Sequence, residues 1–214
     1  MSRVITIDGP AGVGKGTISK LLSHYLNAEI LNSGEIYRTI SFNIIKHKIN
    51  QDDISSIIEY VKSFDYKPLS SNKLYNKNID LVSSQISSIS ELRKLVVKIQ
   101  IDFTKLDSNT NKLLIAEGRD MGTAIFPKAK TKIFLWANSK IRAQRRYQQI
   151  KKAKKNRKFD TILEEIKLRD FRDMSRKIAP LQPAEDSYLI DNSNLDIEQC
   201  FNKILKIIKK NKII

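Results

Sequence analysis

The chain has 214 residues, a formal net charge of +16 and a single cysteine, Cys200. One cysteine excludes a disulfide framework and a zinc site built on cysteines. With 41% hydrophobic and 29% charged residues, we expect a globular protein with one main core and room for a small appended domain. No apolar run approaches the roughly 18 residues of a membrane span, and we expect no secretory signal at the first residues. The sequence therefore predicts a cytoplasmic protein that does not enter a membrane.

Short apolar runs alternate with helical patterns along the chain. The β-branched run at 3–8 predicts a buried strand, and the apolar spacing at 15–26 predicts a helix with one buried face. Further strands are expected at 28–31, 111–118, 131–137 and 186–191, and further helices at 33–48, 88–106, 139–155, 159–178 and 195–211. This alternation predicts an α/β fold, with a parallel sheet of about five strands covered by helices on both faces.

Two stretches do not fit these layers. Residues 50–87 are polar and rich in serine, without a long apolar period, and we expect a small insert there. Residues 151–158, "KKAKKNRK", carry six positive charges in eight positions, which is too many for a packed face. We expect this basic run to be a mobile loop or a helix end.

The segment "IDGPAGVGKGTISK" at 7–20 contains the spacing G-x-x-x-x-G-K between a predicted strand and a predicted helix. In that context, backbone N–H groups, the helix N-terminus and a lysine converge on phosphate oxygens. The alternative is a tight glycine turn with an incidental lysine. We favour a nucleoside triphosphate site, and assign ATP to the loop Gly9, Pro10, Ala11, Gly12, Val13, Gly14, Lys15, Gly16 and Thr17.

The loop ends in "GKGT", with Gly16 in place of the usual Ser or Thr directly after Lys15. This ending resembles the nucleoside monophosphate kinases, and the resemblance implies that Thr17 bonds phosphate. Glu117 closes the strand predicted at 111–118, where a P-loop protein keeps the acidic residue that orders metal-bound water. We therefore expect Mg²⁺ to accompany ATP, held through water by Thr17 and Glu117 and by no direct protein ligand.

Four further segments sharpen this resemblance. They are "LNSGEIYR" at 31–38, "SSQI" followed by Arg93, "EGRDMGT" at 117–123 and "LRDFRDMSRKIAPL" at 168–181. With the glycine loop, they resemble the bacterial cytidylate kinases in type and in order, through most of the chain. The resemblance implies transfer of the γ-phosphate of ATP to CMP or dCMP. As partners we expect ATP and CMP or dCMP, without nucleic acid or membrane, and we expect a monomer. Asn32 departs from the family's common aspartate, and Trp136 stands where the family often has aspartate, which predicts a packing role.

The resemblance also implies the roles of individual residues. Ser84, Arg93 and Asp120 would contact cytosine, Arg169 and Asp173 the pentose, and Ser33, Tyr37 and Arg38 the monophosphate, with Arg119 also in the CMP set. The catalytic set is Lys15, Arg119, Arg169 and Arg176. Two assignments have alternatives, because Ser83 adjoins Ser84 and Tyr37 could be a core tyrosine. Cytosine offers an amino donor that suits Asp120, and acceptors that suit Arg93.

Phosphoryl transfer between two phosphates needs no general base, so positioning and charge neutralisation should carry it. Arg169, Asp173 and Arg176 are spaced to share one helix face, with Arg172 beside them. Arg142, Arg145 and Arg146 form a second cluster, for which a solvated surface ladder is an equal alternative. We assign Arg142 to ATP binding.

The expected organisation is a core at 1–38, 88–141 and 177–214, a monophosphate-binding insert at 39–87 and a lid region at 142–176. One alternative function is a kinase for another monophosphate, such as UMP. A less favoured alternative is an RNA-binding P-loop protein, suggested by the net charge and the basic run at 151–158.

Overall fold

The structure is a computed structural model that describes residues 3–64, 72–106, 112–152 and 156–213. The chain divides into two compact units. The sheet unit consists of residues 1–30 and 112–214, and the helical unit consists of residues 31–111.

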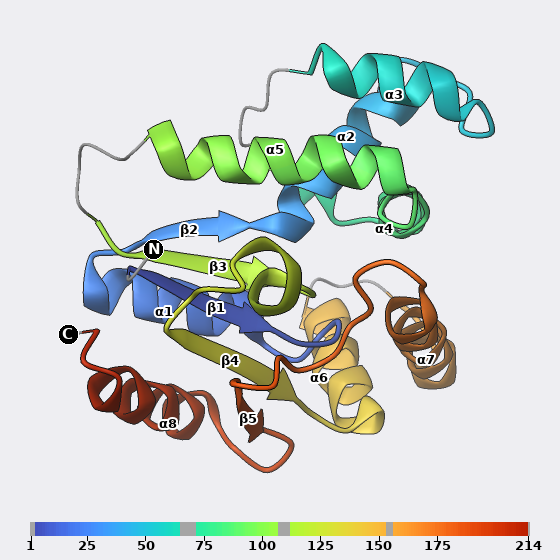
Figure 1. Cartoon of the computed structure of the whole chain (residues 1–214). Coiled ribbons are helices and arrows are strands. Elements are labelled where there is room, and N and C mark those ends of the chain that lie inside the picture. Colours follow the sequence, from blue (N-terminus) through green and yellow to red (C-terminus); the bar gives the residue numbers. More distant parts are fainter. Residues whose placement is uncertain (1–2, 65–71, 107–111, 153–155, 214) are drawn as a thin grey trace. The chain divides into compact units, whose positions relative to one another are not determined.

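The sheet has five strands in the order β2-β3-β1-β4-β5 (Figure 1). Their bounds are Val4–Asp8 for β1, Glu29–Asn32 for β2, Leu114–Gly118 for β3, Thr131–Trp136 for β4 and Tyr188–Asp191 for β5. Strand β1 pairs in parallel with β3 and with β4, and β4 pairs in parallel with β5. The predicted parallel sheet is confirmed, and β1 is its central strand.

Helices α1 (Lys15–Leu26) and α8 (Ile197–Lys210) pack against one face of the sheet (Figure 1). Side chains alternate along a strand, so Ile5 and Ile7 of β1 enter this core. Thr6 and Asp8 belong to the opposite face, where a single π-helical turn, η2 (Met121–Ile125), contacts β1. The end of β1 thus presents one polar side chain away from α1.

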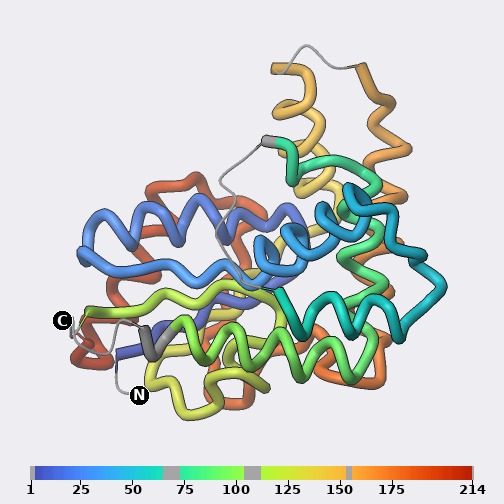
Figure 2. The backbone as a smooth tube through the Cα atoms, turned by 90° about the horizontal axis from the view of Figure 1, so that it is seen from above, coloured from blue at the N-terminus to red at the C-terminus, as the bar shows by residue number. Residues whose placement is uncertain are grey.

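Helices α6 (Ser139–Lys152) and α7 (Phe159–Ser175) run side by side (Figure 2). Their contact is a small apolar cluster that includes Ile150 and Ile162, closed near the tip by the ring of Tyr147 at 6.2 Å from that of Phe159. Most of the predicted lid region is therefore a helical hairpin. Of the basic run, the first two lysines end α6, and residues 153–155 lie outside the described residues.

The helical unit contains four α-helices and one short 3₁₀ turn among its described residues. They are α2 (Ser33–Lys46), α3 (Ile54–Lys62), η1 (Asn72–Leu74), α4 (Lys77–Ile86) and α5 (Ser90–Leu106). The unit is wider than the predicted insert at 39–87, because it also includes the whole of α2 and α5, which pack with α4 and α3.

The stretch at 50–87, expected to be a small insert without a long apolar period, contains the helices α3 and α4 in its described part. Asp53 caps α3 by accepting from the backbone N–H of Ser56 at 3.1 Å, and Asn76 caps α4 by accepting from that of Ile79 at 3.0 Å. Apolar residues such as Ile57 and Val82 are then buried on one face of each helix. The helices are short, so their period was hidden among the serines.

Candidate active site

The glycine loop joins β1 to α1 through a backbone that other residues adopt with difficulty. Gly9, Gly12 and Gly14 have φ of 148°, 72° and 102°. A Cβ at Gly9 would lie 2.2 Å from the carbonyl oxygen of Leu135, which leaves no room for a side chain. Gly14 precedes α1 without a side chain that could cap it. The first N–H groups of α1 and their positive dipole are therefore available to an anion.

Lys15 is the first residue of α1, and its ammonium group folds back over the loop. Its Nζ donates to the carbonyl oxygens of Gly9 at 2.7 Å and Pro10 at 2.9 Å. Burial, followed by the positive charge of Arg119, holds the pKa of Lys15 well below its ordinary value, although Glu117 and Asp8 oppose this shift. An anion that enters the loop would stabilise the charged form of this desolvated lysine.

Glu117 is buried near the carboxyl end of β3, on the same face of the sheet as α1. The hydroxyl of Ser19 in α1 donates to its Oε2 at 2.7 Å. A Cβ at Gly16 would lie 3.7 Å from Glu117 Oε1, so the carboxylate adjoins the first turn of α1. Thr17, in that turn, is exposed. These oxygen donors suit a hard cation such as Mg²⁺, and no cluster of three or more His, Cys, Asp or Glu side chains competes for a metal among the described residues.

Three arginines surround two carboxylates in the sheet unit. Arg119 Nε donates to Asp173 Oδ2 at 2.8 Å, and Arg169 Nε lies 3.9 Å from the same oxygen. Arg176 Nη2 lies 3.8 Å from Asp120 Oδ1. Burial alone would raise the pKa of Asp173, but the neighbouring guanidinium groups outweigh it and hold that pKa below its ordinary value. The predicted residues of 117–123 and of 168–181 are thus brought together.

Arg142 is not part of a solvated ladder. Only 1% of it is exposed, and its guanidinium makes a two-pronged ion pair with Asp170 of α7. It also donates to the carbonyl oxygens of Ala137 at 2.8 Å and Ala11 at 3.0 Å. The surface interpretation is therefore wrong for Arg142, which ties the α6–α7 hairpin to the phosphate loop. Its ring neighbour is Trp136, whose packing role is confirmed by a guanidinium carbon 5.9 Å from the indole centroid.

The other two arginines of the cluster at 142–146 differ in their exposure: Arg145 is half-buried and Arg146 is exposed. Arg145 donates to the side chain of Asn192 at 3.1 Å and to its backbone carbonyl at 2.7 Å. The amide of Asn192 in turn donates to the carbonyl oxygen of Val13 at 2.8 Å. The phosphate loop is consequently supported from both α6 and the end of β5.

In the helical unit, the predicted monophosphate residues all lie on α2. Ser33 is its first residue, is buried, and accepts from Nε2 of Gln100 at 2.9 Å. Because the serine hydroxyl accepts from this amide, its own hydrogen remains to be donated. Arg38 pairs with Asp80 at 2.9 Å. Tyr37 is only 8% exposed, so its side chain belongs to the core of this unit, whatever further contact it makes.

The adjacent serines of α4 have different environments. Ser83 is buried and donates to the carbonyl of Ile79 at 2.6 Å. Its Oγ also lies 3.0 Å from the Oγ of Ser41. Ser84 is half-buried, so of the two it is the one placed to meet a ligand. Arg93 of α5 is 6% exposed and donates to the carbonyl oxygen of Ser87 at 3.1 Å. The nine predicted CMP residues thus divide between the units, with five in the helical unit and Arg119, Asp120, Arg169 and Asp173 in the sheet unit.

Sequence reasoning missed several supporting residues. Asp8, Gln100, Asp170 and Asn192 each bond to a predicted site residue or to a neighbour of one. Asp8 had a local signal, because a charged residue that ends a buried β-branched run has to find a partner. The other three gave no local sign, since each pairs with a residue far away along the chain.

The class of protein follows from these features. A parallel sheet whose central strand runs into a glycine loop and then a helix is the core of the P-loop nucleotide-binding proteins. In fold, the chain is similar to a Thermus thermophilus protein (TM-score 0.55, 13% identity, 97% of this chain and 96% of that one) and to an uncharacterized protein from Eubacterium ventriosum (TM-score 0.54, 14% identity, 98% and 99%).

Sequence comparison identifies the family. The profile of the cytidylate kinase family matches residues 5–210. The chain is 41% identical to the cytidylate kinase of Mycoplasmopsis synoviae, over 96% of this chain and 97% of that one. It is 37% identical to that of Pasteurella multocida (97% and 95%) and 41% identical to that of Rickettsia africae (98% and 92%). The chain belongs to the cytidylate kinase family.

Proposed function

We propose that this chain transfers the γ-phosphate of ATP to CMP or dCMP and releases ADP with CDP or dCDP. The observation that carries this proposal is the joint presence of a phosphate loop on the central strand and a separate group of arginines and carboxylates around Asp173 and Asp120. The first suits a triphosphate, and the second suits a nucleotide that offers amino, hydroxyl and phosphate groups. Membership of the cytidylate kinase family supports cytosine as the acceptor base.

The phosphate loop would bind the triphosphate of ATP. Its backbone N–H groups and the dipole of α1 would face the phosphate oxygens, and Lys15 would exchange two carbonyl partners for an anion. Mg²⁺ would neutralise part of the developing charge, with Thr17 and Glu117 ordering its water molecules. Lys15 and the arginines Arg119, Arg169 and Arg176 would neutralise the rest. The acceptor phosphate is already an anion, so no proton has to be removed by the protein.

Discrimination between cytosine and uracil would depend on Asp120. The amino group of cytosine would donate to the carboxylate of Asp120, where uracil offers only an acceptor. Two acceptors facing each other at a buried position leave polar groups unpaired, which costs about 1–3 kcal/mol for each group. We therefore expect clear rejection of UMP rather than a mild preference.

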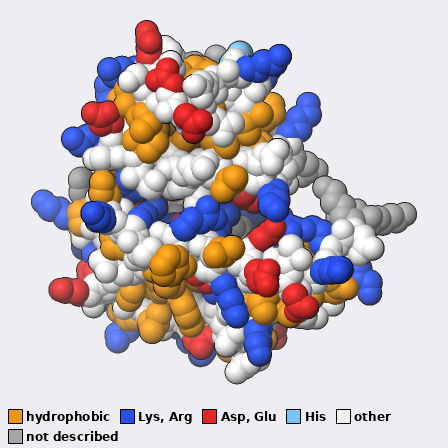
Figure 3. Space-filling view, turned by 90° about the vertical axis from the view of Figure 1, so that its right-hand side faces the viewer, with side chains coloured by type: hydrophobic (Ala, Val, Ile, Leu, Met, Phe, Trp, Pro, Cys, Tyr) orange, Lys and Arg blue, Asp and Glu red, His pale blue; other side chains and the backbone are white. Residues whose placement is uncertain are grey.

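The net charge of +16 and the basic run at 151–158 support the RNA-binding alternative. Figure 3 shows Lys and Arg side chains spread among acidic and hydrophobic ones on the face that it presents. No helix in the described part of the chain combines the length and the apolar character that a bilayer span requires. We propose a cytoplasmic monomer whose charge serves phosphorylated small molecules.

A coupled assay of ADP release, with ATP and a panel of monophosphates, tests the proposal. We expect kcat/KM for CMP or dCMP to exceed that for UMP, AMP and GMP by about a hundredfold or more. An equal or higher value for another monophosphate would overturn the assignment of substrate. Binding of labelled RNA that weakens steeply between low and moderate salt, without nucleotide turnover, would instead favour the RNA-binding alternative.

A further inference from the structure

Asp8, the last residue of β1, directs its carboxylate away from α1 and into the opposite face of the sheet. Both oxygens are used, because Oδ1 accepts from the backbone N–H of Met121 at 2.9 Å and Oδ2 accepts from that of Gly122 at 2.7 Å. Only 4% of Asp8 is exposed. One side chain of the central strand therefore holds two successive peptide groups of a segment 113 residues further along the chain.

The same segment packs closely against β1, on the face of the sheet opposite α1. A Cβ at Gly122 would lie 2.9 Å from Thr6 Oγ1 and 3.3 Å from Asp8 Oδ2, so the close approach depends on glycine. Met121 is fully buried. The two residues that come directly before this anchored pair are Arg119 and Asp120, so Asp8 holds the peptide that joins Asp120 to Met121.

A carboxylate fits this position better than a neutral side chain of the same size. Two N–H donors need two acceptor oxygens, whereas an asparagine would offer one oxygen and turn an N–H₂ group toward the second donor. Burial raises the pKa of Asp8 to about 6, with the nearby charge of Asp120 adding to the rise and the two amides and Lys15 opposing it. Burial of the ionised Asp8 carboxylate therefore costs free energy. We take this cost as a sign that the arrangement of Met121 and Gly122 that Asp8 holds is functional.

We propose that Asp8 is a positioning residue for the acceptor nucleotide, because it fixes the peptides of Met121 and Gly122 and so aims Arg119 and Asp120. Arg119 then meets Asp173, and Asp120 lies within reach of Arg176. The inference rests on the proposed function, since it takes Arg119 and Asp120 to be residues that bind CMP. Asp8 acts through these residues and contacts no reacting atom.

The variant Asp8→Asn tests the proposal through the two Michaelis constants. We expect the KM for CMP to rise about tenfold or more, while the KM for ATP changes by less than about twofold. Asp8 also adjoins Gly9 of the phosphate loop, so equal rises in both constants would mean that it acts through that loop, and would overturn the proposal. Unchanged constants would overturn it as well.

Two matched variants separate positioning from loss of stability. Asp196→Ala removes the side chain that caps α8 by accepting from Gln199 N–H at 2.7 Å. It should lower the melting temperature without raising the KM for CMP relative to the KM for ATP. Gly122→Ala pushes the same segment away from β1 and should also raise the KM for CMP more than the KM for ATP. It therefore tests the proposal if Asp8→Asn does not fold. Failure of a folded Gly122→Ala protein to raise the KM for CMP would then overturn the proposal.

Asp120→Asn distinguishes this inference from the function on which it rests. If that variant leaves the KM for CMP unchanged, the assignment of Asp120 to the acceptor is wrong, and the role of Asp8 is lost with it. If Asp120→Asn raises the KM for CMP but Asp8→Asn does not, the proposed function stands and the inference about Asp8 is refuted.

Discussion

Arg142 and Asp170 form a buried two-pronged ion pair that joins α6 to α7, and the same guanidinium donates to the carbonyl oxygen of Ala11 in the phosphate loop. The pair therefore couples the helical hairpin to the site that binds phosphate. Its side chains are 1% and 12% exposed, so water screens the two charges little. Removal of one partner leaves the other as an uncompensated charge.

Asp170→Asn should lower the free energy of unfolding by about 3 kcal/mol, because Arg142 would keep its burial without its counter-charge. The KM for ATP should rise, since Arg142 also supports Ala11. Urea denaturation and steady-state kinetics measure the two effects. Glu165→Gln is the control on the same helix, because its pair with Arg157 is about a third exposed and should be worth less than about 1 kcal/mol. Equal losses in the two variants would contradict the structural role of Arg142.

Most of the fold that could be predicted depends on patterns among residues that are close in sequence. The strand and helix expected at 3–8 and 15–26 are β1 and α1, because a glycine loop between an apolar run and an amphipathic pattern is a local signal. Arg142 could not be placed in this way, since the same spacing of arginines suits an exposed ladder. What buries it is Asp170, 28 residues away, together with a carbonyl oxygen 131 residues away.

The candidate site shows the same division. Its acidic and basic residues were recognised by resemblance, but the means of holding them in place was not. Asp8 bonds to peptides that are 113 and 114 residues distant, and Gln100 reaches a serine that is 67 residues away. Pairing between side chains and distant backbone has no period, so only the folded chain reveals it.

Lys15→Ala should abolish phosphoryl transfer and leave the fold intact. The loss should be on the order of 10³ in kcat, because a full charge near the transferred phosphate is removed. Stability should change little, because removal of a buried ammonium whose burial lowers its pKa well below the ordinary value offsets the loss of its two hydrogen bonds to backbone carbonyls. Turnover is followed by the coupled assay and folding by circular dichroism. Near-normal turnover in a folded variant would refute the role of the loop.

The two serines of α4 provide a matched pair. Ser84→Ala should raise the KM for CMP several-fold and change the free energy of unfolding by less than about 0.5 kcal/mol, because its side chain is half-buried. Ser83→Ala should do the reverse and cost about 1 kcal/mol of stability, since it loses the bond to the Ile79 carbonyl. Kinetics and urea denaturation of both variants check this pattern. The opposite pattern would assign the ligand to Ser83.

Asp8 should give the protein a measurable pH dependence of stability. Its pKa in the folded protein is about 6, above the value of 3.8 for an unburied carboxyl. The folded state therefore holds this proton more tightly, and the contribution of Asp8 is fully present below about pH 4 and is lost as the pH rises through about 6. The stability of the wild type relative to Asp8→Asn should fall by about 2 kcal/mol between about pH 4.5 and pH 7. Urea denaturation at several pH values measures this difference, and a constant difference would show that Asp8 titrates at its ordinary pKa.

The α6–α7 hairpin should be the first region that trypsin attacks in the free protein, within the basic run at 151–158. Lys151, Lys152 and Lys158 are exposed there, whereas Arg142 at the other end of α6 is anchored by Asp170 and Ala11. If closure over ATP and CMP brings the hairpin against the triphosphate, an ATP analogue with CMP should slow cleavage in this run and reduce hydrogen exchange across 142–176.

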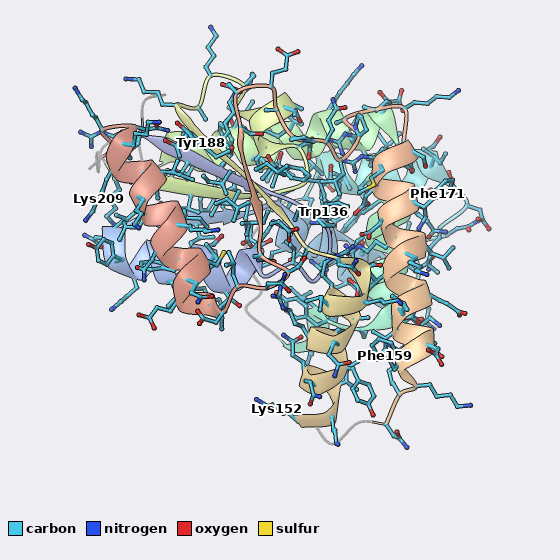
Figure 4. All side chains as sticks on the ribbon, turned by 90° about the horizontal axis from the view of Figure 1, so that it is seen from below. Trp136, Lys152, Phe159, Phe171, Tyr188 and Lys209 are labelled. Carbon is cyan, nitrogen blue, oxygen red and sulfur yellow. The ribbon has the colours of Figure 1, made fainter. Side chains whose placement is uncertain are left out.

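The hairpin test has an internal control, because Figure 4 places Lys152 at the end of α6 and Lys209 near the end of α8, and both are exposed. Cleavage near Lys209 should proceed at the same rate with and without nucleotides, which excludes a direct effect of the nucleotides on trypsin. Because Arg142 is already held in the free protein, we expect the change in exchange to grow from the start of α6 toward its tip. Equal protection of the tip in the free and the nucleotide-bound protein would mean that the hairpin is a fixed surface, and that the excess of lysine at 151–158 serves solubility rather than closure.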